Sequence, residues 1–476
     1  MSSMMHRRLT RRGLLGGLVG IGAAGLVGCV ATPAPQVVKE TVVVEREVTV
    51  EVEKVVETVV TPTAAPRTGP AAVTYYTWID ADRLGKFGDW VKPFQDAHPD
   101  ILIQLIPAIG WNIENRQKLQ AMMLAGTPPD VVGYAPPDFY WSGMVISLEP
   151  FLERDNYDIS DIPAPLVNRA SYKGELYNFP LQAGGNNPIM AYNKTMWAEA
   201  GIEPPPSKWN DPAWTWDEWV ARCKAVMDFQ NEKTGTTDYW GLPDMMWFMS
   251  HTRQWNIWWI NVEDMKTITC DTPEMLDCYT HIADLWCKHK IIPQAEITQG
   301  WGPIDAFLGG KTAMRVVGSW EYNVYDKSEI DWDFAPFPKP EKGNTNAELD
   351  PDGGAAIVKG SKNPDQAWEF IKWLDDGNFY PFWASTPSRP KFIEDWSKVT
   401  FVNHPTVNFM LLAEALANSR EQDRITLHPC WGEMWGKVIN PRREQLEACN
   451  LSVAQMLAEC QVELQKISDT CQQKTF

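Results

Sequence analysis

The side chains of this chain that could perform catalysis do not form any of the usual catalytic signatures. The 476 residues contain no GxSxG, HExxH, CxxC or GxxxxGK motif, so the common nucleophile, metalloprotease, redox and phosphate-binding arrangements are missing. Ser388 and Lys391 match SxxK, but Pro390 between them does not suit the helix that this motif needs. Paired carboxylates such as Asp375 and Asp376 are expected by chance among 61 acidic residues. We therefore expect a protein that is not an enzyme.

Metal binding is also disfavoured. Cys278, His281, Cys287 and His289 form the only dense group of cysteine and histidine, and the spacing predicts that they share a helix. On a helix Cys278 and His281 lie on one face while Cys287 points away, and no second cluster completes a tetrahedral set. We expect core or disulfide cysteines beside surface histidines, and neither a metal ion nor a cofactor.

The aromatic residues are more informative, because the chain has 24 tryptophans. An indole ring offers a flat face to the C–H surface of a sugar, and its N–H can bind a hydroxyl. In open α/β sheets, ligands bind beyond the carboxyl ends of the strands. Three predicted strands run into suitable residues: Trp78 and Asp80; Tyr134, Asp138, Tyr140 and Trp141; and Trp320 and Glu321. Each aromatic residue could instead simply pack in the core, but three such strand ends favour a shared cleft.

The elements that would position these residues follow an α/β alternation. Strands are predicted at 73–77, 101–105 and 130–134, with helices at 86–98 and 114–125 between them. Further strands are predicted at 313–317 and 355–358, and helices dominate 433–473, where Ser452 is a candidate N-cap. Alternation at these lengths is typical of a parallel sheet covered by helices.

The N-terminus has the layout of an export signal. Four arginines between positions 7 and 12 precede a short apolar run that is too short for a comfortable membrane span. Its residues fit a twin-arginine signal, and general secretion tolerates them equally. Leu26-Val27-Gly28-Cys29 resembles a bacterial lipobox, which predicts acylation of Cys29, although an ordinary signal peptide with an incidental cysteine is the alternative.

Residues 30–70 differ in composition from the rest, because prolines flank a stretch in which valine alternates with Glu, Lys and Thr. We interpret this stretch as a flexible stalk, with a short coiled coil or β-ribbon as the alternative. About 40 extended residues would span on the order of 130 Å. The formal net charge of −18 excludes nucleic acid as a favoured partner, since such a surface repels phosphate backbones.

Eight cysteines follow Cys29, and an exported protein can pair them as disulfides. Eight cysteines allow 105 pairings, among which the sequence does not choose. Helix geometry excludes two individual cysteine pairs. Cys278 and Cys287 would lie on opposite faces of one helix, and Cys460 and Cys471 would lie three turns apart on the last one.

Several segments together resemble the family 1 extracellular solute-binding proteins, which include maltose-binding and other sugar-binding components of ABC importers. The matching segments are LQAMMLAGTPPDV at 119–131, YKGELYNFP at 172–180, AYNK at 191–194 with AGIEPP at 200–205, FLGGKTAM at 307–314 with GSW at 318–320, and KGSKNP at 359–364 with AW at 367–368. Each is weak alone, but their order and spacing are specific, and the resemblance covers nearly everything from residue 71 onward.

The resemblance implies an α/β, two-lobed periplasmic-binding-protein fold of type II, each lobe a mixed sheet flanked by helices, with hinge segments between the lobes. The expected divisions are a signal peptide at 1–28, a lipidated N-terminus and stalk at 29–70, lobe 1 at 71–184 plus 354–384, and lobe 2 at 185–353 plus 385–476. Such proteins close around their ligand by hinge bending.

Carried over residue by residue, the family's ligand contacts fall on both lobes. They are Trp78, Tyr134 and Asp138 from lobe 1, and Asn186, Trp247, Trp320 and Trp431 or Trp435 from lobe 2. Gly353 and Gly354 would lie at a lobe crossing, where backbone amides can approach the ligand. The alignment is uncertain by one or two positions at Asp138 and Asn186.

The predicted function is a lipid-anchored monomer that captures a mono- or oligosaccharide outside the cytoplasmic membrane and delivers it to ABC permease subunits. One alternative keeps the fold and changes the ligand to a polyamine, peptide, phosphodiester or metal chelate. A phosphate ligand would need a basic cluster, and Arg389 is the only arginine expected near the cleft. The other alternative is a secreted carbohydrate-active enzyme.

Overall fold

The first sheet is built around β1, whose residues on one face are buried throughout, whereas those on the other face are exposed at Ala72 and become buried at Tyr76. The computed structural model of the protein describes residues 69–108, 113–183, 189–245, 248–295, 302–344, 347–349, 353–421 and 423–471. β1 (Ala71–Trp78) pairs in parallel with β2 (Ile101–Ala108) and β3 (Val131–Val132), and β3 pairs antiparallel with β10 (Ala356–Ile357). The sheet is therefore mixed, in the order β10-β3-β1-β2.

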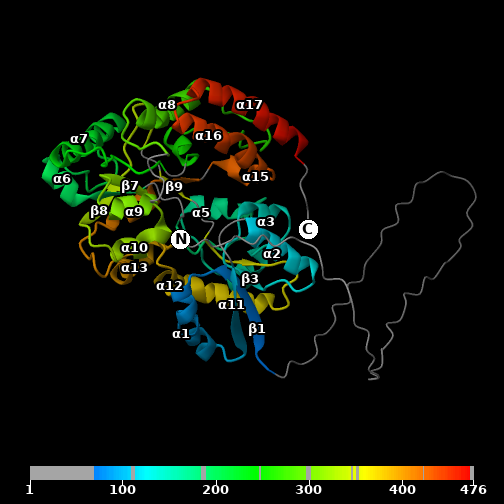
Figure 1. Ribbon diagram of the computed structural model, residues 1–476. Coiled ribbons are helices and arrows are strands. Elements are labelled where there is room, and N and C mark those ends of the chain that lie inside the picture. The colour runs from blue at the N-terminus through cyan, green and yellow to red at the C-terminus, as the bar shows by residue number, and fades with distance from the viewer. Residues whose placement is uncertain are drawn as a thin grey trace, which may run out of the picture. The chain divides into compact units, whose positions relative to one another are not determined.

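Helices cover both faces of this sheet. Tyr75 packs on one side against Phe370, with ring centroids 5.3 Å apart, and α1 (Ala81–Ala97) and α11 (Pro364–Trp373) lie on this side. Tyr76 lies on the other side with Leu119 of α2 (Ile113–Leu124) and with α3 (Pro137–Trp141). Figure 1 shows α1 and α11 beside β1. The period of two along β1 thus divides the core into two layers.

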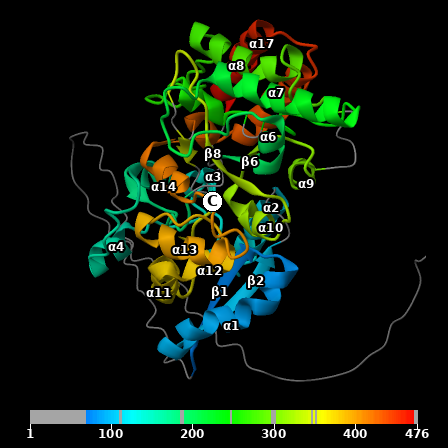
Figure 2. The same cartoon turned by 90° about the vertical axis from the view of Figure 1, so that its left-hand side faces the viewer.

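The second sheet consists of β6 (Ile189–Asn193), β7 (Met314–Val317) and β8 (Trp332–Pro336) in the order β7-β6-β8. Ile189 and Ala191 face one core, whereas Met190 and Tyr192 face another. Helices α10 (Tyr322–Asp326) and α13 (Ile393–Thr400) lie on the first side (Figure 1, Figure 2). Helices α6 (Lys194–Ala200), α7 (Trp216–Thr234) and α8 (Pro273–Cys287) lie on the second. Both described ladders of this sheet are antiparallel, which differs from the mixed sheet expected for each lobe.

Capping side chains fix where the helices beside the second sheet begin. α6 (Lys194–Ala200), α7 (Trp216–Thr234), α8 (Pro273–Cys287) and α17 (Val453–Thr470) are capped by Asn193, Thr215, Thr272 and Ser452. Each side chain accepts a hydrogen bond from a backbone N–H of the first turn, which no helical carbonyl can reach. The N-cap predicted at Ser452 is confirmed, since its hydroxyl accepts from the Gln455 N–H at 3.2 Å.

Two disulfides fix the C-terminal helices, one to the end of α8 and one within the C-terminal segment itself. Cys287 pairs with Cys449, and Cys430 pairs with Cys471, with Cα atoms 5.7 and 6.0 Å apart. The two cysteine pairs that helix geometry excludes, Cys278–Cys287 and Cys460–Cys471, are not formed. Cys223, Cys270, Cys278 and Cys460 are free thiols, all buried.

The remaining elements are short. They are α4 (Glu149–Asp155), α5 (Ala164–Arg169), β4 (Ser171–Tyr172), β5 (Glu175–Leu176), η1 (Ser250–Gln254), α9 (Pro303–Leu308), η2 (Ser319–Glu321), α10 (Tyr322–Asp326), β9 (Ala347–Leu349), η3 (Leu374–Asn378), α12 (Phe379–Trp383), η4 (Pro390–Phe392), α13 (Ile393–Thr400), α14 (Met410–Ala417), β11 (Ser419–Glu421), η5 (Arg424–Leu427), α15 (Trp431–Met434), η6 (Trp435–Ile439) and α16 (Asn440–Glu447). Within the described ranges, none of the helices has the length and apolar character that crossing a bilayer requires.

Three segments that are distant in sequence run side by side between the two sheets. Phe179 and Ala355 exchange backbone hydrogen bonds of 2.8 and 3.0 Å, and the Ala183 N–H donates to the Thr386 carbonyl at 2.8 Å. Gly354 permits this approach, because a Cβ atom there would lie 2.3 Å from the Phe179 carbonyl oxygen. These contacts involve the chain positions at which the sequence analysis places its lobe crossings.

The predictions for the N-terminus cannot be compared with the fold. The expected signal peptide at 1–28, the lipidated Cys29 and the stalk up to residue 68 lie outside the described residues.

Candidate ligand-binding site

Trp78 and Tyr134 lie at the same edge of the first sheet. The parallel pairing of β1 with β3 matches Tyr76 with Val132, and the Gly133 N–H donates to the Tyr76 carbonyl at 2.9 Å. Continued for two residues, this register sets Trp78 beside Tyr134. Both are partly exposed. The strand-end prediction therefore brings two aromatic side chains together at the carboxyl edge, where ligands bind in such sheets.

Asp80 serves first as a helix cap. Its carboxylate accepts from the Arg83 N–H at 2.8 Å and forms an ion pair with the Arg83 guanidinium. Arg83 also donates to the Phe382 carbonyl at 2.8 Å, and its guanidinium lies 5.5 Å from the ring centre of Trp383. This cap explains why α1 begins at Ala81, earlier than the predicted residue 86.

Tyr140 lies in the core, not on the surface of a cleft. It is 4% exposed, its hydroxyl donates to the Ala135 carbonyl at 2.7 Å, and its ring stacks on Tyr177 at 5.9 Å. The predicted ligand contact by Tyr140 is not supported by this burial. Its role is to hold α3 against the sheet.

The end of β7 carries Trp320 on an exposed turn above a buried ion pair. Trp320 is 41% exposed, whereas Glu321 is 3% exposed. The Glu321 carboxylate accepts two hydrogen bonds from the Arg315 guanidinium, which also donates to the Tyr325 hydroxyl at 2.9 Å. Glu321 is therefore a supporting residue for η2, and the direct ligand contact predicted for it is likewise not supported.

Asp244 adds a further carboxylate near this ion pair. The pKa of Asp244 is raised to about 6, chiefly by burial; the nearby charge of Arg315 lowers this pKa, and that of Glu321 raises it. The Asp244 Oδ1 atom is buried and has no hydrogen-bond partner among the described residues.

Trp431 and Trp435 form a pair on consecutive helical turns, with ring centroids 5.6 Å apart and planes inclined by 43°. Both are partly buried against the buried cluster that contains Met190 and Tyr192 of the second sheet. Asn186 and Trp247 lie outside the described residues, as does the side chain of Asp138. The predicted glycines Gly353 and Gly354 are buried against Gln182 and Phe179, so their missing side chains serve the packing of the crossing segments.

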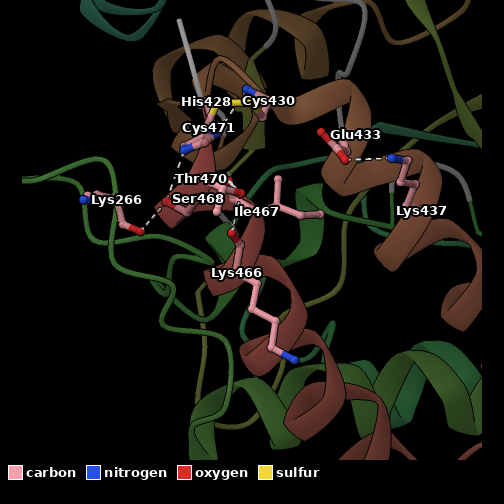
Figure 3. Close-up of a disulfide and its surroundings, with 10 residues drawn as sticks. All are labelled: Lys266, His428, Cys430, Glu433, Lys437, Lys466, Ile467, Ser468, Thr470 and Cys471. Atoms are coloured by element: carbon pink, nitrogen blue, oxygen red, sulfur yellow. Dashed lines mark hydrogen bonds and ion pairs between the residues drawn. A yellow bond between two sulfur atoms is a disulfide. The ribbon is translucent and has the colours of Figure 1, made fainter.

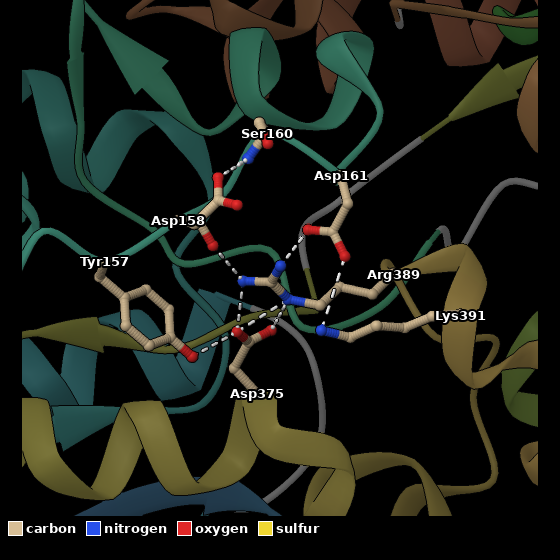
Figure 4. A network of polar contacts seen from close by, with 7 residues as sticks. All are labelled: Tyr157, Asp158, Ser160, Asp161, Asp375, Arg389 and Lys391. Carbon is tan, nitrogen blue, oxygen red and sulfur yellow. Dashed lines mark hydrogen bonds and ion pairs between the residues drawn. The ribbon is translucent and has the colours of Figure 1, made fainter.

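Arg389 is fully engaged by carboxylates and is not available to an anionic ligand. Its guanidinium donates to both oxygens of Asp375, to Asp161 and to the Asp158 carbonyl, as Figure 4 shows. The Asp375 carboxylate also accepts from the Tyr157 hydroxyl at 2.7 Å. This network fixes the segment that carries Arg389 to η3 and to the loop before α5, so that Arg389 itself is not available to a phosphate ligand.

The structure also contains a cavity of about 760 Å³ that the sequence analysis did not find. One wall is formed by Trp141, α5 and the β4–β5 hairpin, and the other by residues 264–266, 424–429 and 468–471. The residues that line the cavity are spread over more than 300 positions of the chain, and they do not belong to a recognisable sequence motif. The only signals were Trp141 beyond the third strand and the YKG turn at 172–174.

The chain matches the bacterial extracellular solute-binding proteins over residues 89–390, which is more than half of its length. The chain belongs to this family. Its members are binding proteins of ABC importers that work outside the cytoplasm, so the protein is an extracellular solute-binding protein of such a system. The resemblance seen in the sequence is thereby confirmed.

A curated relative and several solved structures agree with this assignment. An uncharacterized ABC transporter extracellular-binding protein of Pyrococcus horikoshii is 25% identical over 138 residues, which span 27% of this chain and only 30% of the relative. A Listeria monocytogenes ABC substrate-binding protein in complex with cycloalternan has a TM-score of 0.68 at 20% identity, covering 84% of this chain and 99% of that one. A Bdellovibrio bacteriovorus MalE domain bound to maltotriose has a TM-score of 0.61 at 19% identity, covering 82% and 98%. These likenesses confirm the two-lobed α/β fold.

Proposed function

We propose that this solute-binding protein captures a carbohydrate and passes it chemically unaltered to the permease of an ABC importer. The observation that carries the proposal is Trp320. It is 41% exposed at the carboxyl end of β7, whereas Trp197, Trp219 and Trp396 are almost completely buried. An exposed indole held on a rigid turn suits a sugar face better than it suits water. Structural neighbours of the chain hold cycloalternan and maltotriose, which supports the same ligand class.

Binding would use both sheets. Trp78 and Tyr134 would offer aromatic surface from lobe 1, at 71–184 plus 354–384, and Trp320 with Trp431 or Trp435 from lobe 2, at 185–353 plus 385–476. The three adjacent segments near Phe179, Gly354 and Thr386 would act as the hinge, because the chain runs from one sheet to the other through them and their backbones are hydrogen-bonded side by side. Closure would remove water from the ligand and strengthen its hydrogen bonds.

We further propose that Cys29 anchors the protein by its lipid, that residues 29–70 act as a stalk, and that the monomer works without metal or cofactor. Export would follow either the twin-arginine or the general route. A lipid anchor with a long tether would keep the binding protein near its permease while leaving it free to meet ligands.

A thermal-shift screen with mono- and oligosaccharides tests the proposal. A bound sugar stabilises the native state by mass action, by about 2.7 kcal/mol at one hundred times its Kd. Chromatography of the recovered sugar distinguishes a binding protein, which returns it intact, from a carbohydrate-active enzyme, which converts it. If no sugar raises the melting temperature while a polyamine or peptide does, the carbohydrate assignment fails.

A further inference from the structure

The cavity of about 760 Å³ lies between α3, α5 and the β4–β5 hairpin on one side and residues 264–266, 424–429 and 468–471 on the other. α3, which begins just beyond Tyr134, contacts η5 of the opposite wall. The far wall includes Pro429, two residues before Trp431 in the chain, and Cys471, which the disulfide joins to Cys430, the residue that precedes Trp431. Each wall thus contains residues that lie within a few positions of a predicted ligand residue in the chain, Tyr134 on one side and Trp431 on the other, although neither of them lines the cavity.

One wall of the cavity is an aromatic platform. The Trp141 and Tyr172 rings stack with centroids 5.7 Å apart and planes inclined by 16°. Tyr172 is the last residue of β4 and precedes the two-residue turn of the β4–β5 hairpin. The turn consists of Lys173 and Gly174, which both have left-handed backbone torsions, with φ of 53° and 86°. This turn is tight because such torsions match the twist of a hairpin. The Lys173 ammonium group lies 5.1 Å from the Tyr172 ring centre.

The charge of the cavity differs from that of the whole chain. Its lining contains three basic side chains, Lys173, Lys266 and Arg424, and two acidic ones, Asp264 and Asp469. The Asp264 carboxylate already accepts from the backbone N–H of Lys266 and from Thr267, and Asp469 accepts from Gln465 at 2.9 Å. The cavity is thus net positive on a chain with a net charge of −18.

The second wall is held rigidly. The His428 ring accepts from the Cys430 N–H at 3.2 Å and contacts the Ser468 hydroxyl at 3.2 Å, and that hydroxyl donates to the Lys266 carbonyl at 2.7 Å. Figure 3 shows these contacts around the Cys430–Cys471 disulfide. The backbone that carries Lys266 is therefore tied to α17 and to the loop before α15. A preformed wall loses little conformational entropy when a ligand binds.

We propose that this cavity binds the carboxylate-bearing unit of an acidic glycan, with a sugar ring on Trp141 and Tyr172 and its carboxylate beside Lys173, Lys266 and Arg424. The inference rests on the proposed function, because it extends the carbohydrate site to an additional, charged unit. An aromatic face beside ammonium and guanidinium groups selects a uronate over a neutral hexose, since the carboxylate forms charge-assisted hydrogen bonds that a hydroxymethyl group cannot form.

Isothermal titration calorimetry of the intact protein tests this assignment. The probes are trimers of galacturonate, glucuronate and mannuronate, their methyl esters, which keep the shape and remove the charge, and maltotriose as a neutral sugar. At low salt, at least one free acid should bind about tenfold more tightly than its methyl ester. This difference in affinity should shrink at about 0.5 M salt, because salt screens the interaction between the carboxylate and the basic side chains. Titration with single uronates shows whether the cavity binds a free acidic monosaccharide or requires the acidic unit to be part of a longer chain.

Variants locate the effect. K173Q and K266Q should each reduce the preference for the acid severalfold and leave ester binding unchanged, and W141A should weaken both. K437Q is the matched control, because Lys437 is exposed, pairs with Glu433 on nearby α15 and does not line the cavity. Equal affinity for acid and ester, or an equal loss in K437Q, overturns the inference while leaving neutral sugar binding intact. If no sugar binds at all, the proposed function itself fails.

Discussion

Trp320 is held in place by residues that no ligand would need to touch. The Arg315–Glu321 ion pair fixes the turn from below, and the Trp320 indole packs over Gly318, where a Cβ atom would lie 2.4 Å from the ring. A rigid, partly desolvated aromatic side chain is the usual centre of a binding hot spot. The exposure of Trp320 is thus a built feature of η2 and not an accident of a loose loop.

Replacing Trp320 tests its predicted contact with sugar. W320A should weaken binding of the best sugar from the screen by about 2 kcal/mol, or roughly 30-fold, because the stacking face is lost. W320F, which keeps a flat ring, should lose less. Since the side chain is largely exposed, neither variant should lower the melting temperature of the ligand-free protein by more than a few degrees. Unchanged affinity in W320A would contradict the site proposed here.

His428 makes stability depend on pH in a definite direction. Burial lowers the pKa of His428 from its ordinary value of 6.5 to about 4, so the unfolded chain takes up a proton more readily than the native one. Stability is therefore lost as the pH falls from 6.5 towards 4 and changes no further below 4. The pKa of buried Asp423, raised to about 6 by burial, acts in the opposite sense over this range.

The difference in unfolding free energy between wild type and H428N isolates the effect of His428, because Asp423 is present in both proteins and its contribution cancels. Urea unfolding at several pH values should show wild type losing on the order of 2 kcal/mol relative to H428N between pH 7 and pH 4.5. Parallel stability curves would show that the His428 ring is protonated as easily in the native state as in the unfolded chain.

At the scale of elements, the Arg389 network joins the segment that follows Thr386 to η3, the turn that continues α11. Asp375 and Asp161 bind the same guanidinium, but their side chains are 3% and 38% exposed. Removing a buried partner leaves a desolvated charge, whereas an exposed carboxylate is replaced by water. D375N should therefore cost about 3 kcal/mol of unfolding free energy and D161N less than about 1 kcal/mol. Equal costs measured by urea unfolding would mean that burial does not decide the strength of this network.

The Cys430–Cys471 disulfide connects the end of α17 to the loop before α15, across 41 residues. Closing a loop of this length stabilises the native state by about 2–4 kcal/mol, chiefly by limiting the unfolded chain. The C430S/C471S variant should unfold at correspondingly lower urea concentration, and amide hydrogens at the end of α17 should exchange faster. A variant as stable as wild type would show that the helix end is held by packing alone.

What could be predicted from sequence depended on whether the determining contacts are local. The strands around Val73 and Ile103 and the cap at Ser452 follow from periodicity and from one side chain, and all were predicted. The burial of Tyr140 depends on the Ala135 carbonyl and that of Glu321 on Arg315, so a strand-end argument could not distinguish them from Trp320. The cavity could not be predicted for the same reason, because its two walls come from distant parts of the chain that meet only in the folded protein.

At the scale of the whole molecule, two kinds of contact join the two sheets. One buried cluster runs from Tyr75 of the first sheet to Ile189 and Ala191 on one face of the second, and a separate cluster covers the other face of the second sheet. The segments at Phe179, Gly354 and Thr386 add backbone hydrogen bonds between the two sheets. A ligand that touches both sides favours the closed arrangement by its extra contacts in that state. Small-angle scattering should therefore show a smaller radius of gyration when the best sugar of the screen is added at saturation.

Gly354 provides a test of this hinge that leaves the proposed ligand contacts in place. In G354A the new Cβ atom would lie 2.3 Å from the Phe179 carbonyl oxygen, a backbone atom that can yield only if the crossing segments separate. We expect sugar affinity to fall about tenfold or more, since even 1.4 kcal/mol of displacement in the hinge lowers the population of the closed state by that factor. The matched control is G85A in α1, where an added Cβ atom meets nothing within 4 Å. If G354A binds sugar and contracts as wild type does, the crossing segments can separate without cost, and closure must depend on other parts of the chain.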